Sequence, residues 1–302
     1  MSCLRTALVK LSPLFPVACA LLALPHGLQA QEPLQVASLE YRPPILVVEV
    51  RVNGSEPLPF AFDTGTTTCL LDTQVARRLG IQPVQRPGRS GPGFARARTL
   101  AVGRAVARDL ELVIRDLTPL SDQVSVKLAG ILGFTWMEHF VFEIDYRAGR
   151  LTLWPRAIEL TATAEQLPLP LTLHSPPNLS GASIYVPARL EGRHRCLMMI
   201  DTGTSQAILG RQIAARLGIT VQPIRRAEEG GGLPTPTIGR FELAGRLFTN
   251  VTVVFDPRRG AGPDPFDQCV LGNQQLSEFV VTIDIPRRRV FFRALPPLPA
   301  QK

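Results

Sequence analysis

The sequence predicts an all-β protein built from two homologous lobes, and three observations lead to this fold class. The chain of 302 residues contains an internal repeat. Each copy of the repeat opens with a segment that alternates between apolar and polar residues and ends in turn residues, which is typical of a strand in a hairpin. Only one short helix is expected in each copy, and turn residues are dense elsewhere.

The two copies of the repeat align without gaps over their first part. Residues 47–81 match residues 185–219 at a constant offset of 138. Eleven of the nineteen positions from Asp63 to Ile81 are identical to their partners. The similarity resumes at an offset of 139, where 131–134 match 270–273 and 140–153 match 279–292. This pattern is typical of a gene duplication and predicts two lobes related by a pseudo-twofold axis.

The first element expected in the first repeat is a hairpin. Residues 47–52 alternate and end in Asn53-Gly54, which is a strong signal for a tight turn between two strands. The return strand, residues 58–62, leads directly into the segment Asp-Thr-Gly-Thr that begins at Asp63.

A short helix follows in each repeat. In the first, Asp72 is a good N-cap for residues 73–79, and Gly80 stands where a C′ glycine belongs. In the second, Gly218 ends the helix at residues 211–217, and Gly210 replaces the capping aspartate. Further strands are expected over 110–114 and 250–255, and the last hairpins should turn at 147–149 and 286–287.

The first thirty residues are typical of a signal peptide. Basic residues precede a mostly apolar run over 11–24, and Ala30 ends a plausible cleavage site. A membrane anchor needs about 20 apolar residues, and this run is shorter and interrupted by prolines. A lipoprotein signal is rejected because the apolar run continues past Cys19 and Pro16 stands where that motif requires leucine. We therefore expect an exported protein, periplasmic or secreted, with no membrane span after cleavage.

The domain boundaries follow from the leader and the repeat. A tract rich in proline and leucine separates the two copies and is interpreted as a linker. The expected division is a signal peptide at 1–30, a first lobe at 31–155, a linker at 156–182 and a second lobe at 183–302.

The composition excludes some classes of function. A hydrophobic fraction of 45% with 19% charged residues indicates a globular chain. The formal charge falls from +8 to +6 (8 − 2) without Arg5 and Lys10, and the arginines are scattered, so no nucleic-acid partner is expected. Cys69, Cys196 and Cys269 show no metal-binding spacing; we expect buried free thiols, although an exported protein allows one disulfide. No metal or other cofactor is expected.

Two aspartates, Asp63 and Asp201, occupy equivalent positions of the repeat. If the lobes pack about a pseudo-twofold axis, their carboxyl groups meet at that axis. Two carboxylates a few ångströms apart cannot both ionise cheaply, so one keeps a proton. The charged member can then take a proton from water while the protonated member polarises a peptide carbonyl. Such a pair titrates as a unit.

The residues after each aspartate suit this chemistry. A threonine next in sequence can join the two loops through its hydroxyl group, and a glycine allows a tight turn and a close approach of substrate. A second threonine can donate a hydrogen bond to the carboxylate. These supporting residues are Thr64, Gly65 and Thr66 in the first repeat and Thr202, Gly203 and Thr204 in the second.

Each Asp-Thr-Gly-Thr segment follows an apolar strand and precedes an apolar-apolar-Gly segment, at 131–133 and 270–272. Over residues 45 to 295 this arrangement resembles the pepsin/retropepsin superfamily, and is most similar to bacterial retropepsin-like aspartyl proteases with two units in one chain. The resemblance implies two β-barrel lobes with an active-site cleft between them. It also implies catalysis by Asp63 and Asp201, a grip between the lobes by the adjacent threonines, and a peptide or protein substrate. Because both carboxyl groups belong to one chain, we expect an active monomer.

Some alternatives remain open on the sequence alone. Residues 88–94 and 228–234 are candidate flaps or ordinary surface loops, and neither contains the tyrosine that pepsin flaps use. Asp145 and Asp284 are also repeat-equivalent, but each precedes a turn and is expected to be structural. The chain could also be a catalytically weak exported peptide-binding protein that uses the same cleft, or a processing peptidase with one partner protein.

Overall fold

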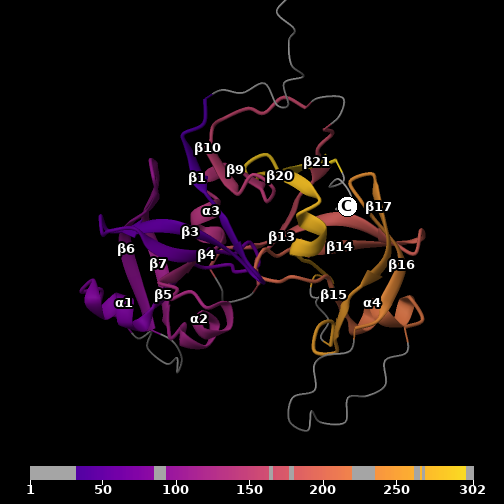
Figure 1. Ribbon diagram of the computed structural model, residues 1–302, viewed down its shortest axis with the longest axis horizontal. Helices are drawn as coiled ribbons and strands as arrows, with labels where there is room; N and C mark the ends of the chain where they lie inside the picture. The colour runs from indigo at the N-terminus through magenta and orange to yellow at the C-terminus, as the bar shows by residue number, and fades with distance from the viewer. Residues whose placement is uncertain are drawn as a thin grey trace, which may run out of the picture.

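A computed structural model describes residues 32–84, 93–162, 166–176, 180–219, 235–261, 266 and 269–296. Two lobes lie side by side, and a further set of strands joins them along one edge (Figure 1). The expected all-β class with two related lobes is confirmed. The expected signal peptide, the second candidate flap and all but the last two residues of the first candidate flap lie outside the described residues.

The strands of the first lobe form a seven-stranded sheet that closes on itself. Their order is β2-β3-β4-β8-β5-β7-β6, and β3 also pairs with β6. The pairs β4–β8 and β5–β7 are parallel, whereas the other neighbours are antiparallel. The elements are β2 (Glu40–Arg42), β3 (Ile45–Val52), β4 (Leu58–Phe62), β5 (Leu70–Asp72), α1 (Thr73–Arg78), β6 (Gly93–Val102), β7 (Ala105–Arg115), α2 (Thr118–Val124), β8 (Gly130–Leu132) and α3 (Phe134–Met137).

The second lobe repeats this plan with one break. The strand order is β17-β16-β13-β14-β19-β15-β18, with β12 beside β13. Strand β7 is continuous, and includes the strand expected over 110–114, but its counterpart is interrupted at Val253. The strand expected over 250–255 is therefore two strands, β17 and β18. The elements are β12 (Thr172–His174), β13 (Ser183–Leu190), β14 (His194–Ile200), β15 (Ile208–Gly210), α4 (Arg211–Arg216), β16 (Thr237–Leu243), β17 (Arg246–Thr252), β18 (Val254–Asp256), β19 (Cys269–Leu271) and α5 (Asn273–Leu276).

The predicted hairpin turn and the predicted helix cap of the first lobe are both found. Asn53 and Gly54 have φ of 53° and 83°, and the Ser55 N–H donates to the carbonyl of Val52 at 2.9 Å, which closes the hairpin turn between β3 and β4. The carboxylate of Asp72 accepts from the first backbone N–H groups of α1, as expected of an N-cap. Both helices end one residue earlier than expected, because their last residues act as C-caps.

A third, six-stranded sheet joins the two lobes. It contains the two hairpins expected to turn at 147–149 and 286–287, but no sequence pattern predicted that they pair with each other. Its order is β1-β10-β9-β20-β21-β11, and every neighbouring pair is antiparallel. The members are β1 (Gln35–Ser38), β9 (Phe140–Asp145), β10 (Arg150–Pro155), β11 (Leu169–Pro170), β20 (Phe279–Asp284) and β21 (Arg289–Ala294). Two short strands, β11 and β12, thus lie within residues 156–182, which were expected to be a linker.

The register at the centre of this sheet reveals the pseudo-twofold axis. Glu143 of β9 pairs with Thr282 of β20, and these positions are equivalent in the repeat because 143 + 139 = 282. The flanking pairs, Phe142 with Ile283 and Ile144 with Val281, exchange under the same operation. A twofold axis that passes between Glu143 and Thr282 requires this register. The predicted pseudo-twofold relation between the lobes is confirmed.

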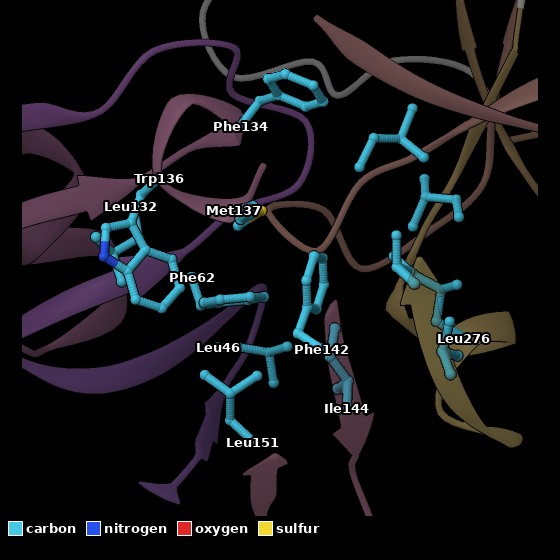
Figure 2. Close-up of a cluster of buried hydrophobic side chains, with 14 of the residues drawn as sticks. Leu46, Phe62, Leu132, Phe134, Trp136, Met137, Phe142, Ile144, Leu151 and Leu276 are labelled. Atoms are coloured by element: carbon cyan, nitrogen blue, oxygen red, sulfur yellow. The ribbon is translucent and has the colours of Figure 1, made fainter. Parts of the chain in front are cut away.

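The main hydrophobic cluster extends through both lobes and the six-stranded sheet. Phe62, the last residue of β4, makes edge-on ring contacts with Phe142 of β9 at 5.4 Å and with Trp136 at 6.5 Å between ring centroids (Figure 2). All three side chains are fully buried. Since Phe62 precedes Asp63, this packing fixes the strand that carries the first candidate aspartate to the sheet on the axis.

Candidate active site

Each candidate aspartate lies directly after a buried strand, beside the strand of the apolar-apolar-Gly segment. Asp63 follows β4, and its N–H donates to the carbonyl of Leu132 in β8 at 3.0 Å. Asp201 follows β14, and its N–H donates to Leu271 in β19 at 3.1 Å. In both lobes these two strands are parallel neighbours. The repeat therefore places the two carboxyl groups in equivalent positions, one from each lobe.

The threonine after each aspartate joins the two loops through a reciprocal set of hydrogen bonds. The Thr64 hydroxyl donates to the carbonyl of Ile200 at 2.8 Å and accepts from the N–H of Thr202 at 3.1 Å. The Thr202 hydroxyl donates to the carbonyl of Phe62 at 2.7 Å and accepts from the N–H of Thr64 at 3.1 Å. Both side chains are fully buried. Each loop is thus held in place by backbone groups of the other lobe.

The glycines of the two loops lie against the carboxyl group of the opposite lobe. A methyl group on Gly203 would lie 2.9 Å from the carboxyl atoms of Asp63, and one on Gly65 would lie closer still to Asp201. Real Cβ atoms do not approach heavy atoms to these distances. Glycine is therefore required at both positions because the two carboxyl groups cross the axis between the loops. The structure brings Asp63 and Asp201 together, as the sequence predicted.

The surroundings of the two aspartates differ by one hydrogen bond. Asp63 accepts from the Gly65 N–H at 2.8 Å and from the Thr66 hydroxyl at 2.5 Å. Asp201 accepts from the Gly203 N–H at 2.8 Å. The hydroxyl of Thr204 was expected to mirror that of Thr66, but within the described part of the chain it makes no hydrogen bond to Asp201. The negative charge is consequently better stabilised on Asp63 than on Asp201.

Electrostatics favour a proton on Asp201. Burial, followed by the nearby carboxylate of Asp63, raises the pKa of Asp201 to about 7. The Gly203 N–H and the charge of Arg259 lower this pKa, but by less than the first two causes raise it. Near neutral and acidic pH, one carboxyl group of the pair therefore holds a proton, and the smaller number of donors to Asp201 favours that residue.

The glycine of each apolar-apolar-Gly segment allows the backbone to approach the aspartate loop. A methyl group on Gly133 would lie 2.6 Å from the carbonyl oxygen of Thr66, and one on Gly272 would lie 2.5 Å from that of Gln206. The next residues, Phe134 and Asn273, donate their N–H groups to the loops at 2.8 and 2.9 Å. These segments therefore fix the loops from behind.

Two residues near the site were missed by the sequence reasoning. Asn273 is buried and contacts the loop of Asp201, and its side-chain oxygen accepts from the hydroxyl of Tyr146 at 2.5 Å. The available signal was a polar residue after the second apolar-apolar-Gly segment, where the first repeat has Phe134. Tyr146 carried no signal because its partner lies in the other repeat.

The other groups considered in the sequence lie outside this pair of loops. Asp145 and Asp284 accept N–H groups of their hairpin turns at 2.9 and 3.2 Å, as expected of structural residues. Cys69, Cys196 and Cys269 are free thiols. The expectation that all three are buried is wrong for Cys196, which is partly exposed because β14 pairs there with β13 alone. Among the described residues, no cluster of three or more His, Cys, Asp or Glu side chains could hold a metal ion.

The helices of the described residues include none long and apolar enough to cross a membrane. The family model described as Aspartyl protease matches the chain twice, at residues 48–136 and 186–274. Each match contains one Asp-Thr-Gly-Thr loop and its apolar-apolar-Gly segment. No curated protein matches the chain.

Proposed function

The chain belongs to the aspartyl protease family, and from this premise we propose that it is an aspartic endopeptidase that hydrolyses peptide bonds with Asp63 and Asp201. The observation that carries the proposal is the meeting of two repeat-equivalent carboxyl groups at the axis, each against the glycine of the opposite loop. A protein that only bound peptides would need neither carboxyl group in this position.

The unequal hydrogen bonds favour different roles for the two aspartates. Asp63 has two donors, so it carries the negative charge and acts as the base. Asp201 has one donor and a raised pKa, so it carries the proton and acts as the acid. The pair supplies both functions that peptide hydrolysis requires.

The proposed reaction proceeds without a covalent enzyme intermediate. Asp63 removes a proton from a water molecule, whose oxygen forms a bond to the carbonyl carbon of the peptide. Asp201 gives its proton to the carbonyl oxygen, which yields a tetrahedral diol. The proton on Asp63 then passes to the amide nitrogen, the C–N bond breaks, and a diol hydroxyl proton returns to Asp201 as the carboxyl product forms. The amine leaves, and the pair regains its starting charge.

The test is hydrolysis of a mixed peptide library by wild-type protein, Asp63→Asn and Asp201→Asn. The matched control is Asp109→Asn, because Asp109 is exposed and belongs to strand β7, outside both aspartate loops. Either dyad variant should lose hydrolysis, and the double variant should be barely worse, since the two groups act as one unit. Circular dichroism should show that the variants fold. Wild-type activity should fall as pH rises through about 7, because Asp201 then loses its proton.

Near wild-type hydrolysis by either dyad variant would refute the assignment. A folded wild-type protein that binds peptides in the same cleft but cleaves none would favour the peptide-binding alternative instead.

We further propose that the protein is exported, on the strength of the basic start, the short apolar run and the small residue at Ala30. The protein recovered outside the cytoplasm should begin near Gln31 by N-terminal sequencing. Recovery of exported protein that still begins at Met1 would contradict a cleaved signal peptide.

A further inference from the structure

Asn273 links the Asp201 loop to the other lobe through a fully satisfied side-chain amide. Its Nδ2 donates to the carbonyl of Thr202 at 3.0 Å and to that of Pro44 at 2.7 Å. Its Oδ1 accepts from the hydroxyl of Tyr146 at 2.5 Å. Asn273 is 1% exposed, so these bonds replace water that the amide would otherwise require. The carbonyls of Thr202 and Pro44 can only accept, so they require the NH2 group of the amide on their side. The oxygen then points to Tyr146, whose hydroxyl donates to it and holds the amide in place.

The contact with Thr202 acts on the peptide unit next to the aspartate. The carbonyl of Thr202 accepts from Asn273, and the N–H of the same peptide unit, which belongs to Gly203, donates to Asp201 at 2.8 Å. A peptide unit is planar, so a bond that holds its carbonyl also sets the direction of its N–H. Asn273 therefore sets the direction of the one backbone N–H that donates to the Asp201 carboxyl group among the described residues.

The first repeat holds its aspartate in a different way. The position equivalent to Asn273 is Phe134 (273 − 139), and the position equivalent to Tyr146 is Ile285 (146 + 139). Both are buried members of the hydrophobic cluster. On that side of the axis an apolar pair replaces the polar pair, and the Thr66 hydroxyl supplies a donor directly to the carboxylate. Asn273 and Tyr146 lie beside the loop of Asp201, where, among the described residues, the Thr204 hydroxyl makes no hydrogen bond to the carboxyl group.

We propose that Asn273 is a positioning residue for Asp201, and that the Tyr146 hydroxyl holds its amide in place for this purpose. The role is defined for the reaction proposed above and rests on that function. Asn273 and Tyr146 would act through the Thr202–Gly203 peptide unit, without contact with the substrate. Their loss should free this peptide unit to rotate and should weaken the Gly203 hydrogen bond to the ionised form of Asp201.

The charged and titratable groups that face Asp201 are Asp63, Tyr146 and Arg259. Burial raises the pKa of Tyr146 well above its ordinary value, so this residue stays neutral over the pH range of interest. Replacement of Tyr146 by phenylalanine therefore changes no charge near the pair. A change in titration would then report the hydrogen-bond network rather than a lost charge.

The experiment is a pH titration of carboxyl-¹³C-aspartate-labelled full-length protein by NMR, with the two signals assigned from Asp63→Asn and Asp201→Asn. In Asn273→Leu, the upper apparent pKa of the pair should rise by about one unit, because the ionised form loses a directed donor. Tyr146→Phe should give a smaller rise in the same direction. The matched controls are Phe134→Leu, the equivalent position of the first repeat, and Tyr41→Phe, whose ring contacts Tyr146; both should leave the titration unchanged.

A merely structural role predicts a different result. If Asn273→Leu and Tyr146→Phe lower the melting temperature but leave the upper apparent pKa unchanged, the proposal is overturned. If Asn273→Leu does not fold, Tyr146→Phe decides the question in the same way. The titration needs no turnover. A wild-type protein that hydrolyses no peptide would therefore contradict the proposed function, while the NMR result would still support or overturn the positioning role.

Discussion

At the scale of single residues, the two loops have identical first four residues but unequal hydrogen bonds. Asp63 accepts from a backbone N–H and from the hydroxyl of Thr66, whereas Asp201 accepts, among the residues that the structure describes, from a backbone N–H alone. Thr204 has the same side chain as Thr66, so residue type does not explain the difference between them. The two threonines form a natural matched pair for mutation.

We expect Thr66→Val to lower kcat/KM for peptide hydrolysis by about tenfold or more, since a hydrogen bond to a charged group contributes about 1.5–3 kcal/mol. Thr204→Val removes the same atoms from the other loop and should change kcat/KM by much less. Steady-state kinetics at one acidic pH measures both. Equal losses in the two variants would show that the hydroxyl of Thr66 has no special effect on Asp63.

The sequence located the aspartates, glycines and threonines because each belongs to a contiguous motif that occurs twice. It did not locate Asn273 or Tyr146 as a pair. These residues lie in different repeats, and their contact depends on how the repeats pack. The failure of Thr204 to mirror Thr66 has a similar cause, since a repeat in sequence does not fix the direction of a side chain.

At the scale of elements, the helices α1 and α4 were predicted to within one residue because the residues that end them are local. The expectation of one short helix in each repeat is wrong, because α2, α3 and α5 were not predicted. The first turn of α1 depends on Asp72, whose Oδ1 accepts from Gln74 and Val75. Its Oδ2 also accepts from the N–H of Leu117 at 3.1 Å. The pairings of β9 with β20 and of β11 with β21 were not predicted, because the partners are distant in sequence. Strand β12 pairs with the nearby β13, but no local pattern identifies it.

The cap at Asp72 should be important for stability. Asp72→Ala should lower the free energy of unfolding by about 2 kcal/mol, because it removes an N-cap and leaves the buried N–H of Leu117 without an acceptor. Asp72→Asn retains one oxygen for α1 and should lose roughly half as much. Urea unfolding measures both values. An alanine variant as stable as the wild type would mean that solvent satisfies these N–H groups equally well.

At the scale of the whole molecule, the two repeats meet along the β9–β20 pair of the six-stranded sheet. Phe142, Ile144 and their partners are fully buried there. Glu143 stands opposite Thr282, whose hydroxyl donates to it at 2.9 Å. Burial raises the pKa of Glu143. The carboxyl group at the axis is therefore accommodated by a neutral partner that can donate a hydrogen bond.

A fragment of residues 31–156 holds one aspartate and exposes the pairing edge of β9, so as a monomer it should not hydrolyse peptides. Self-association in the native register would place Glu143 opposite Glu143, and like charges directly opposed destabilise a strand pair. Light scattering after size exclusion should therefore show a monomer near neutral pH. The Glu143→Thr fragment should dimerise more strongly, and any activity should appear only with the dimer. An active monomeric fragment would contradict the two-carboxylate mechanism.

The residues on either side of the axis have an evolutionary consequence. In a symmetric dimer of identical chains, every position on one side of the axis is occupied by the same residue on the other side. Two halves that belong to one chain are free of that constraint. The equivalent positions 143 and 282 hold Glu143 and Thr282, and the equivalent positions 134 and 273 hold Phe134 and Asn273. Each half now uses a hydroxyl group of the other half: Thr282 donates to Glu143, and Tyr146 donates to Asn273. For the first half the divergence is hard to reverse, because a homodimer rebuilt from it would place Glu143 opposite Glu143 at the axis.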